Sequence, residues 1–235
     1  MIYKIIFVLL APLVALQGMY VRRVAIKLSE PTGERSGKDG QGTALRLLIV
    51  GDSAAAGVGV TTQKHALLGN LVSQLSNHYE LTWQLIAKSG KHSGQCHDRL
   101  HRQHNGEVDV VVVSLGVNDV LSNINTKQWL VRQRRLITLL KDQFGAKKII
   151  LTKIPPMERF SLLPQPLRWL LGQRCKEFNL ALAKEIAKDP MLIHLDLSAI
   201  TTNELASDGF HPNQTLYRYW AQAVASQINI NFKPD

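Results

Sequence analysis

The amino-acid sequence predicts an α/β fold in which a parallel sheet lies between two layers of helices. Short apolar runs alternate with longer amphipathic segments from residue 44 to residue 228, which is typical of parallel strands joined by helical crossovers. The runs are near-continuous, as in VDVVVVSL at 108–115, and this indicates strands covered on both faces. With 235 residues, 45% of them hydrophobic and 20% charged, the chain is long enough to bury one full core.

Each expected strand is a short apolar run that ends where turn residues begin. The first run stops at Gly51, and the fourth stops at Pro155 and Pro156, because proline cannot donate to a sheet ladder. We expect a five-stranded parallel sheet, with strands at 45–50, 81–87, 108–115, 148–154 and 192–197.

The segments between the strands carry helical signals. Four leucines between residues 67 and 75 fall on one side of a helix. Thr126 is a good N-cap, and Gly145 lies where a helix C-cap belongs. We expect helices at about 64–78, 93–104, 126–144, 171–187 and 213–228.

The N-terminal segment is apolar. Residues 2–21 contain only Lys4 and Gln17 as strongly polar residues, and their length is close to that of a spanning helix. The stretch also resembles the apolar region of a signal peptide, but it lacks a small-x-small cleavage site. We therefore favour a retained anchor over a cleaved signal, with an interfacial helix as a third alternative. Arg22, Arg23 and Lys27 follow the segment, which favours a cytoplasmic domain over an exported or periplasmic one.

These features divide the chain into an anchor or signal segment at 1–28, a linker at 29–43 and a folded domain at 44–235. The linker is expected because SEPTGERSGKDGQGT is polar and rich in Gly and Ser. The formal net charge of +10 favours anionic partners such as a membrane surface. No basic block is interleaved with aromatic residues, so a nucleic-acid partner is not expected.

The sequence does not indicate a metal or a cofactor. Cys96 and Cys175 lie far apart without zinc-type spacing, and a disulfide between them is possible but not indicated. Gly57 and Gly59 lie near a strand end, but the remaining residues of a dinucleotide or phosphate-binding loop are absent.

Three polar sites follow the first three strands and so fall at one edge of the sheet, where ligands bind in such folds. Ser53 follows the first strand, Gly90 the second and Asn118 the third. A serine hydroxyl becomes a nucleophile when a neighbouring base removes its proton, and the developing oxyanion needs hydrogen-bond donors. The N–H groups of Ser53 and Gly90 and the amide of Asn118 can be these donors, although Gly94 could take the place of Gly90.

A base for Ser53 is expected between the last strand and the last helix. A catalytic histidine needs a carboxylate on its second nitrogen, and Asp208 precedes His211 by three residues. Gly209 can supply a tight bend between them, and Pro212 favours a helix start just after the histidine. The sequence therefore predicts a triad of Ser53, Asp208 and His211.

This combination resembles the SGNH (GDSL-like) hydrolase family over about residues 45–228. The resemblance implies a three-layer α/β/α sandwich of the flavodoxin-like type and metal-free ester hydrolysis. Activities of such proteins include lipase, lysophospholipase, acyl-thioesterase and carbohydrate deacetylase. The four sequence blocks of the family are matched by Gly51-Asp52-Ser53, Ser89-Gly90-Lys91-His92-Ser93, Gly116-Val117-Asn118-Asp119 and Asp208-Gly209-Phe210-His211-Pro212.

Residues 155–171 mix prolines with large apolar side chains. They either cover the core or form an apolar wall that holds an acyl chain or dips into a membrane. The candidates for contact with an acyl chain are Met157, Phe160, Leu163 and Trp169.

The sequence thus predicts a serine esterase that acts on lipid-like acyl esters, lysophospholipids or thioesters and is membrane-associated through residues 2–21. One alternative is a carbohydrate O-deacetylase of the cell envelope, which requires a domain outside the cytoplasm. Another is a catalytically idle protein that binds acyl groups or anchors a partner, against which the intact Ser53, Asp208 and His211 argue. The oligomeric state does not follow from the sequence.

Overall fold

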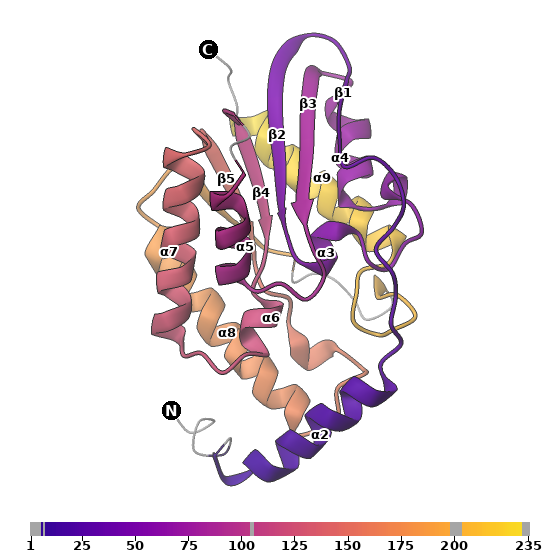
Figure 1. Cartoon of the computed structure of the whole chain (residues 1–235), viewed down its shortest axis with the longest axis vertical. Helices are drawn as coiled ribbons and strands as arrows, with labels where there is room; N and C mark the ends of the chain where they lie inside the picture. Colours follow the sequence, from indigo (N-terminus) through magenta and orange to yellow (C-terminus); the bar gives the residue numbers. More distant parts are fainter. Residues whose placement is uncertain (1–5, 7, 104–105, 198–203, 232–235) are drawn as a thin grey trace.

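A six-stranded sheet forms the centre of the computed structural model, which describes residues 6, 8–103, 106–197 and 204–231 (Figure 1). The strand order is β1-β3-β2-β4-β5-β6. Five neighbouring strands are parallel, as the sequence predicts, and the three-layer α/β/α architecture is confirmed. These strands are β2 (Thr43–Gly51), β3 (Tyr79–Ala87), β4 (Val110–Ser114), β5 (Lys148–Thr152) and β6 (Leu192–Leu195).

The sixth strand corrects the predicted strand count and the predicted linker. β1 (Ser36–Asp39) lies within residues 29–43 and pairs antiparallel with β3 at the edge of the sheet. Its four residues, SGKD, are mostly exposed and have no apolar alternation, so no sequence pattern marks them. The strand exists because β3 offers an unpaired edge and a polar edge strand can cover it.

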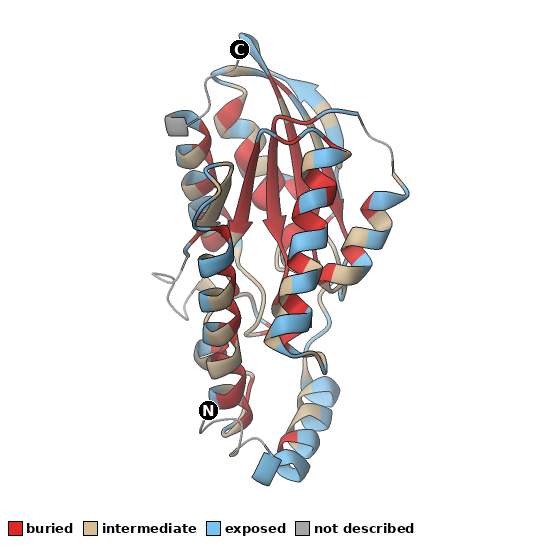
Figure 2. Cartoon of the chain, turned by 90° about the vertical axis from the view of Figure 1, so that its left-hand side faces the viewer, coloured by how far each residue is buried: buried red, intermediate tan, exposed pale blue. Residues whose placement is uncertain are grey.

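Two helical layers cover the faces of the sheet (Figure 1). The central strands β2, β4 and β5 are mostly buried between these layers, as Figure 2 shows, and all five residues of β4 are buried. On one face lie α3 (Ser53–Ala56), α4 (Leu67–Leu75) and α9 (Gln214–Asn231). On the other lie α5 (Ser93–His101), α7 (Thr126–Asp142) and α8 (Leu167–Ile186). The shorter elements are η1 (Gln63–His65), α6 (Val117–Val120) and η2 (Met157–Arg159).

Near the N-terminus, α2 (Ala11–Val24) packs against the start of α8 (Figure 1). Val14 is buried in this contact, and the Gln17 side chain donates to the carbonyl oxygen of Gln165 and accepts from the N–H of Leu167. The anchor predicted over residues 2–21 includes residues 2–5 and 7, which lie outside the described part of the chain. Within the described part, no helix combines the length and the apolar character that crossing a bilayer requires.

Candidate active site

The sheet topology brings three candidate residues to neighbouring strand ends. β2 pairs with β3 on one side and with β4 on the other, and Gly51 at its end is level with both Ala87 and Ser114. Ser53, Gly90 and Asn118 follow these three strand ends. The chain runs from β2 to β3 and then crosses to β4 on the opposite side of β2. This reversal is the place where open α/β sheets form ligand crevices.

Ser53 is the first residue of α3, and its position is fixed by close backbone contacts. A Cβ on Gly51 would lie 2.4 Å from the carbonyl oxygen of Ser114, so only glycine allows β2 to end this close to β4. The Asp52 carboxylate caps the helix by accepting the N–H of Ala54. From α9, the Tyr217 hydroxyl donates to the backbone oxygen of Val58 at 2.7 Å and also contacts that of Ala54. The sequence analysis did not identify Tyr217, because its spacing in α9 indicates only a core position.

His211 bridges Ser53 and Asp208. Its Nε2 atom lies 2.8 Å from Ser53 Oγ, and its Nδ1 atom lies 2.6 Å from Asp208 Oδ2. Gly209 supplies the bend between the acid and the histidine with a φ of +65°. The structure thus brings together the three residues that the sequence analysis combined into a triad. In this arrangement the imidazole can accept the serine proton while its second nitrogen is held by the carboxylate.

The Asp208 carboxylate is well suited to stay ionised. Burial alone would raise the pKa of Asp208, but hydrogen bonds from the His211 ring and from the N–H groups of His211 and Phe210 lower it on balance. Asp52 behaves in the opposite way. Its carboxyl is fully enclosed, and burial raises its pKa from 3.8 to about 7, although the N–H of Ala54 and the charge of His211 act in the other direction.

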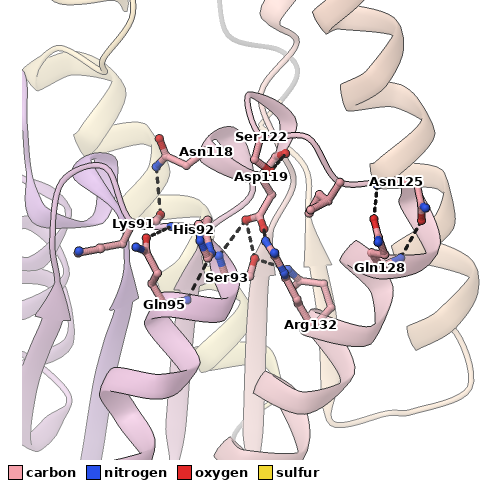
Figure 3. Close-up of polar contacts among 12 residues, drawn as sticks. Lys91, His92, Ser93, Gln95, Asn118, Asp119, Ser122, Asn125, Gln128 and Arg132 are labelled. Atoms are coloured by element: carbon pink, nitrogen blue, oxygen red, sulfur yellow. Dashed lines mark hydrogen bonds and ion pairs between the residues drawn. The ribbon is translucent and has the colours of Figure 1, made fainter. Parts of the chain in front are cut away.

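The loop after β3 is connected to Asn118 through its backbone (Figure 3). The Asn118 amide donates to the carbonyl oxygen of Lys91 at 3.0 Å and makes a longer contact of 3.4 Å with Asp52 Oδ2. Gly90 has a φ of +76°, and no atom lies within 4 Å of where its Cβ would be. Gly94, the alternative glycine, belongs to the first turn of α5, where a Cβ would touch the His92 ring.

Asp119 binds Ser93 at the other end of the same loop (Figure 3). Its carboxylate is fully buried and accepts both the N–H and the hydroxyl of Ser93, at 2.9 and 2.6 Å. Arg132 of α7 donates to the second oxygen of Asp119, and Gln133 donates to the Ser93 hydroxyl. The start of α5 is therefore fixed to α6 and α7 beside Asn118.

A cavity of about 500 Å³ opens from Ser53 and His211 towards the ends of β5 and β6. Ion pairs of Lys153 with Asp196 and of Lys176 with Glu158 lie at its wall. Most of the wall is apolar, which suits a hydrocarbon chain. The apolar lining residues are Leu115, Val117, Ile154, Pro155, Pro156, Phe160, Leu180, Leu197, Leu205, Phe210, Leu216 and Trp220.

Of the four predicted acyl-contact residues, Phe160 lines the cavity and the other three do not. The Phe160 ring packs edge-on against Phe210, whose ring in turn contacts His211. Met157 and Leu163 are buried in the core, because η2 and the turn after it direct their side chains towards α8. Trp169 lies on α8 with 37% of its surface exposed. The sequence analysis missed Leu205, Leu216 and Trp220 as cavity residues.

Comparison with known proteins identifies the family. The chain matches the GDSL-like Lipase/Acylhydrolase family over residues 49–219, and it belongs to this family of SGNH-type hydrolases. It is therefore an ester-hydrolysing enzyme. No curated protein sequence matches the chain.

Solved structures of esterases have the same fold. The psychrotrophic esterase EstA from Pseudoalteromonas sp. is 18% identical, with a TM-score of 0.60 over 79% of this chain and 97% of that one. The aryl esterase of M. smegmatis is 17% identical, with a TM-score of 0.63 over 80% and 100% of the two chains. The acetylxylan esterase Axe2 from Geobacillus stearothermophilus is 19% identical, with a TM-score of 0.58 over 82% and 96%. At these identities the similarity establishes the fold.

The raised pKa of Asp52 predicts a pH-dependent effect of Asp52→Asn on stability. Between pH 3.8 and about 7 the folded chain keeps a proton on Asp52 that the unfolded chain has released, so this group makes the protein less stable as the pH rises. Asparagine does not titrate in this range, so the substitution removes this pH-dependent loss of stability. The free energy of unfolding of Asp52→Asn should therefore rise relative to wild type between about pH 4.5 and about pH 7.5, measured by urea denaturation.

Ser226→Ala, at an exposed position on α9, changes no titrating group and serves as the control, so its difference from wild type should stay constant across the same range. An Asp52→Asn difference that does not change with pH would contradict the account of this buried carboxyl.

Proposed function

We propose that the protein is a serine esterase in which Ser53 attacks the acyl carbon of an ester with an apolar acyl chain. The observation that carries the proposal is the position of His211, whose two ring nitrogens contact Ser53 Oγ and Asp208 at the mouth of an apolar cavity. A serine, a histidine and a carboxylate in this order form the arrangement that activates a hydroxyl for acyl transfer.

The reaction follows from this geometry. His211 Nε2 accepts the Ser53 proton as Oγ attacks the carbonyl, and Asp208 stabilises the imidazolium that forms. The imidazolium then protonates the leaving alcohol as the tetrahedral intermediate collapses to an acyl-enzyme. A water molecule, deprotonated by His211, attacks the acyl-enzyme, and the Ser53 hydroxyl is regenerated as the carboxylic acid leaves.

We assign the oxyanion donors to the N–H groups of Ser53 and Gly90 and the side-chain amide of Asn118. Gly90 is favoured over Gly94 because its left-handed backbone leaves open space where a side chain would stand. Asn118 keeps its bond to Lys91 and exchanges the 3.4 Å contact with Asp52 for the oxyanion. All these donors come from the ends of adjacent strands and need little rearrangement during the reaction.

The apolar wall of the cavity favours lipid-like acyl esters, lysophospholipids or acyl thioesters over sugar acetates. An acetyl group would leave most of the 500 Å³ cavity without contacts, whereas each buried methylene of a longer chain contributes about 0.8 kcal/mol. Phe160, Phe210 and Trp220 are the aromatic side chains in this wall. A carbohydrate deacetylase would instead need polar groups directed at a sugar.

The proposal predicts hydrolysis of p-nitrophenyl esters with a preference for longer acyl chains. The full-length protein should turn over the octanoate ester with a higher kcat/KM than the acetate ester, because the longer chain fills the cavity. Ser53→Ala should lower the rate by at least ~10³-fold. Ser226→Ala, an exposed serine on α9, should retain the wild-type rate as a control.

A preference for acetate would favour the deacetylase alternative. The absence of turnover of every ester would favour a protein that only binds acyl groups.

We further propose that α2 lies on the surface of an anionic membrane. Its inner face packs on the domain through Leu10, Val14 and Val21, yet its outer face is apolar as well. The outer residues recur at helical spacing and are exposed, and α2 is largely in the exposed colour in Figure 2. A helix that is apolar on its solvent side indicates a lipid or protein contact. The exposed apolar residues of α2 are Leu13, Leu16, Met19, Tyr20 and Val24, and Val8, Leu9 and Ile26 lie just outside its ends.

Charge favours the lipid surface as the partner of this outer face. Arg22 and Arg23 in the last turn of α2 and Lys27 just after it are exposed, and the chain carries a net charge of +10. Basic residues beside an apolar helix face attract anionic headgroups while the apolar side chains enter the interface.

This proposal predicts binding of the full-length protein to phosphatidylglycerol vesicles and weaker binding to phosphatidylcholine vesicles in co-sedimentation. Replacement of both Leu13 and Leu16 by Glu should lower the affinity for the vesicles about tenfold or more, because two charged side chains replace apolar ones that enter the lipid interface. Val131→Glu, at an exposed apolar position on α7, is the matched control and should bind like wild type. Equal binding of the α2 variant and wild type would contradict the proposal.

A further inference from the structure

The segment before the family-matched region holds the loop that carries Gly90. The family match begins at residue 49, and Glu30 lies well before it. Glu30 Oε1 accepts the N–H of Ser89 at 2.8 Å and the Ser89 hydroxyl at 2.7 Å. Its other oxygen accepts from Arg35 at 2.7 Å, and Arg35 also donates to the carbonyl oxygen of Ala87 at the end of β3. The Glu30 carboxylate and the Arg35 guanidinium therefore bind the backbone where β3 ends and the loop begins.

The loop is held in the same way at both of its ends. Glu30 takes the N–H and hydroxyl of Ser89, as Asp119 takes the N–H and hydroxyl of Ser93. Gly90 follows the Glu30 end directly, with no atom within 4 Å of its Cβ position. Nothing in the family-matched part of the described chain is seen to hold Ser89 in place of Glu30. The placement of Gly90 thus depends on a residue from the N-terminal segment.

The N-terminal segment is also anchored where it passes α3. The backbone of Thr32 exchanges hydrogen bonds with Thr61 and Gln63, and Pro31 is buried where it meets Gly57 at the end of α3. A Cβ on Gly57 would lie 2.7 Å from the Pro31 ring. These contacts fix the backbone directly after Glu30 relative to α3, which carries Ser53, so Glu30 can hold Ser89 in a defined position.

We propose that Glu30 is a positioning residue that holds the Gly90 N–H in place as an oxyanion donor. The inference rests on the proposed function, in which Gly90 contributes to the oxyanion hole. Glu30 touches no reacting atom and acts through Ser89. Because an oxyanion exists only during the reaction, a displaced donor lowers kcat and leaves substrate binding largely unchanged.

The electrostatics of Glu30 fit a permanent clamp. Burial alone would raise the pKa of Glu30, but the bonds from Ser89 and the charge of Arg35 lower it to about 2. The carboxylate is therefore ionised at any pH at which the histidine of the triad can act as a base. Removal of the charge requires a substitution, and the effect of that substitution should be independent of pH in the neutral range.

The test compares Glu30→Ala, Glu30→Gln and the control Glu34→Ala in the full-length protein. Glu34 is exposed in the same segment. Kinetics on a p-nitrophenyl ester give kcat and KM, and hydrogen exchange followed by mass spectrometry reports the amides of Ser89 and Gly90. For Glu30→Ala we expect kcat about tenfold lower, KM within about twofold of wild type, and faster exchange confined to this loop. Glu30→Gln should fall between wild type and Glu30→Ala, because its amide oxygen can still accept from Ser89.

Three results would overturn the proposal: a wild-type kcat in Glu30→Ala, a loss of kcat matched by faster exchange throughout the chain, or equal effects of Glu34→Ala. If Glu30→Ala does not fold, Glu30→Gln and Ser89→Ala decide the matter. A lower kcat together with faster hydrogen exchange confined to this loop in these two variants supports the proposal. A wild-type kcat and wild-type hydrogen exchange in both variants overturn it.

Failure of the proposed function gives a different result. If the wild type hydrolyses no ester, the catalytic assignment fails, and hydrogen exchange still tests the clamp itself. Protection of the Ser89 amide in wild type that is lost in Glu30→Ala supports the clamp, whereas unchanged exchange overturns it.

Discussion

The pairing of β2 with both β3 and β4 is the constraint on which the site depends. Gly51 is level with Ala87 on one side and with Ser114 on the other, so three chain segments leave the sheet at the same height. The approach to Ser114 is too close for any side chain at position 51. The Ser53 hydroxyl, the loop with Gly90 and the Asn118 amide, which come from distant parts of the sequence, therefore meet at one edge of the sheet. Asn118 is one of the groups placed in this way.

The candidate catalytic residues are held in place by different contacts. Ser53 is held by its own helix cap and by Tyr217, and His211 is held by Asp208 within one tight bend. Within the loop around Gly90, the N–H of Lys91 makes a long hydrogen bond of 3.4 Å to the carbonyl oxygen of Lys88, and no atom lies within 4 Å of the Cβ position of Gly90. Carboxylates supply further support from outside the loop. One of these carboxylates is Glu30, which lies in the segment that follows α2. The N-terminal part of the chain therefore contacts the candidate site directly.

Much of the fold, and the approach of Ser53, Asp208 and His211 to one another, could be predicted because the signals are local. Each central strand is an apolar run that ends at a turn residue, and Asp208 and His211 sit three residues apart around a glycine. The sixth strand could not be predicted, because polar residues at an exposed edge have no periodic pattern. The role of Glu30 could not be predicted either, because its hydrogen bonds with Ser89 join residues that are distant in the sequence and follow no spacing rule. Of the four residues named for contact with an acyl chain, only Phe160 lies in the cavity wall, together with Pro155 and Pro156 of the same segment. The direction of side chains in this proline-rich connection depends on how the connection packs on α8, which the sequence does not show. Met157, for example, points into the core and not into the cavity.

The most direct test of the central claim is intact-protein and peptide mass spectrometry after reaction with a fluorophosphonate. The account predicts one covalent adduct per chain, located on Ser53, and a large loss of the labelling rate in His211→Ala, because the hydroxyl is reactive only when its proton is accepted by the imidazole. An adduct on another residue, or a labelling rate of Ser53 that does not depend on His211, would contradict it.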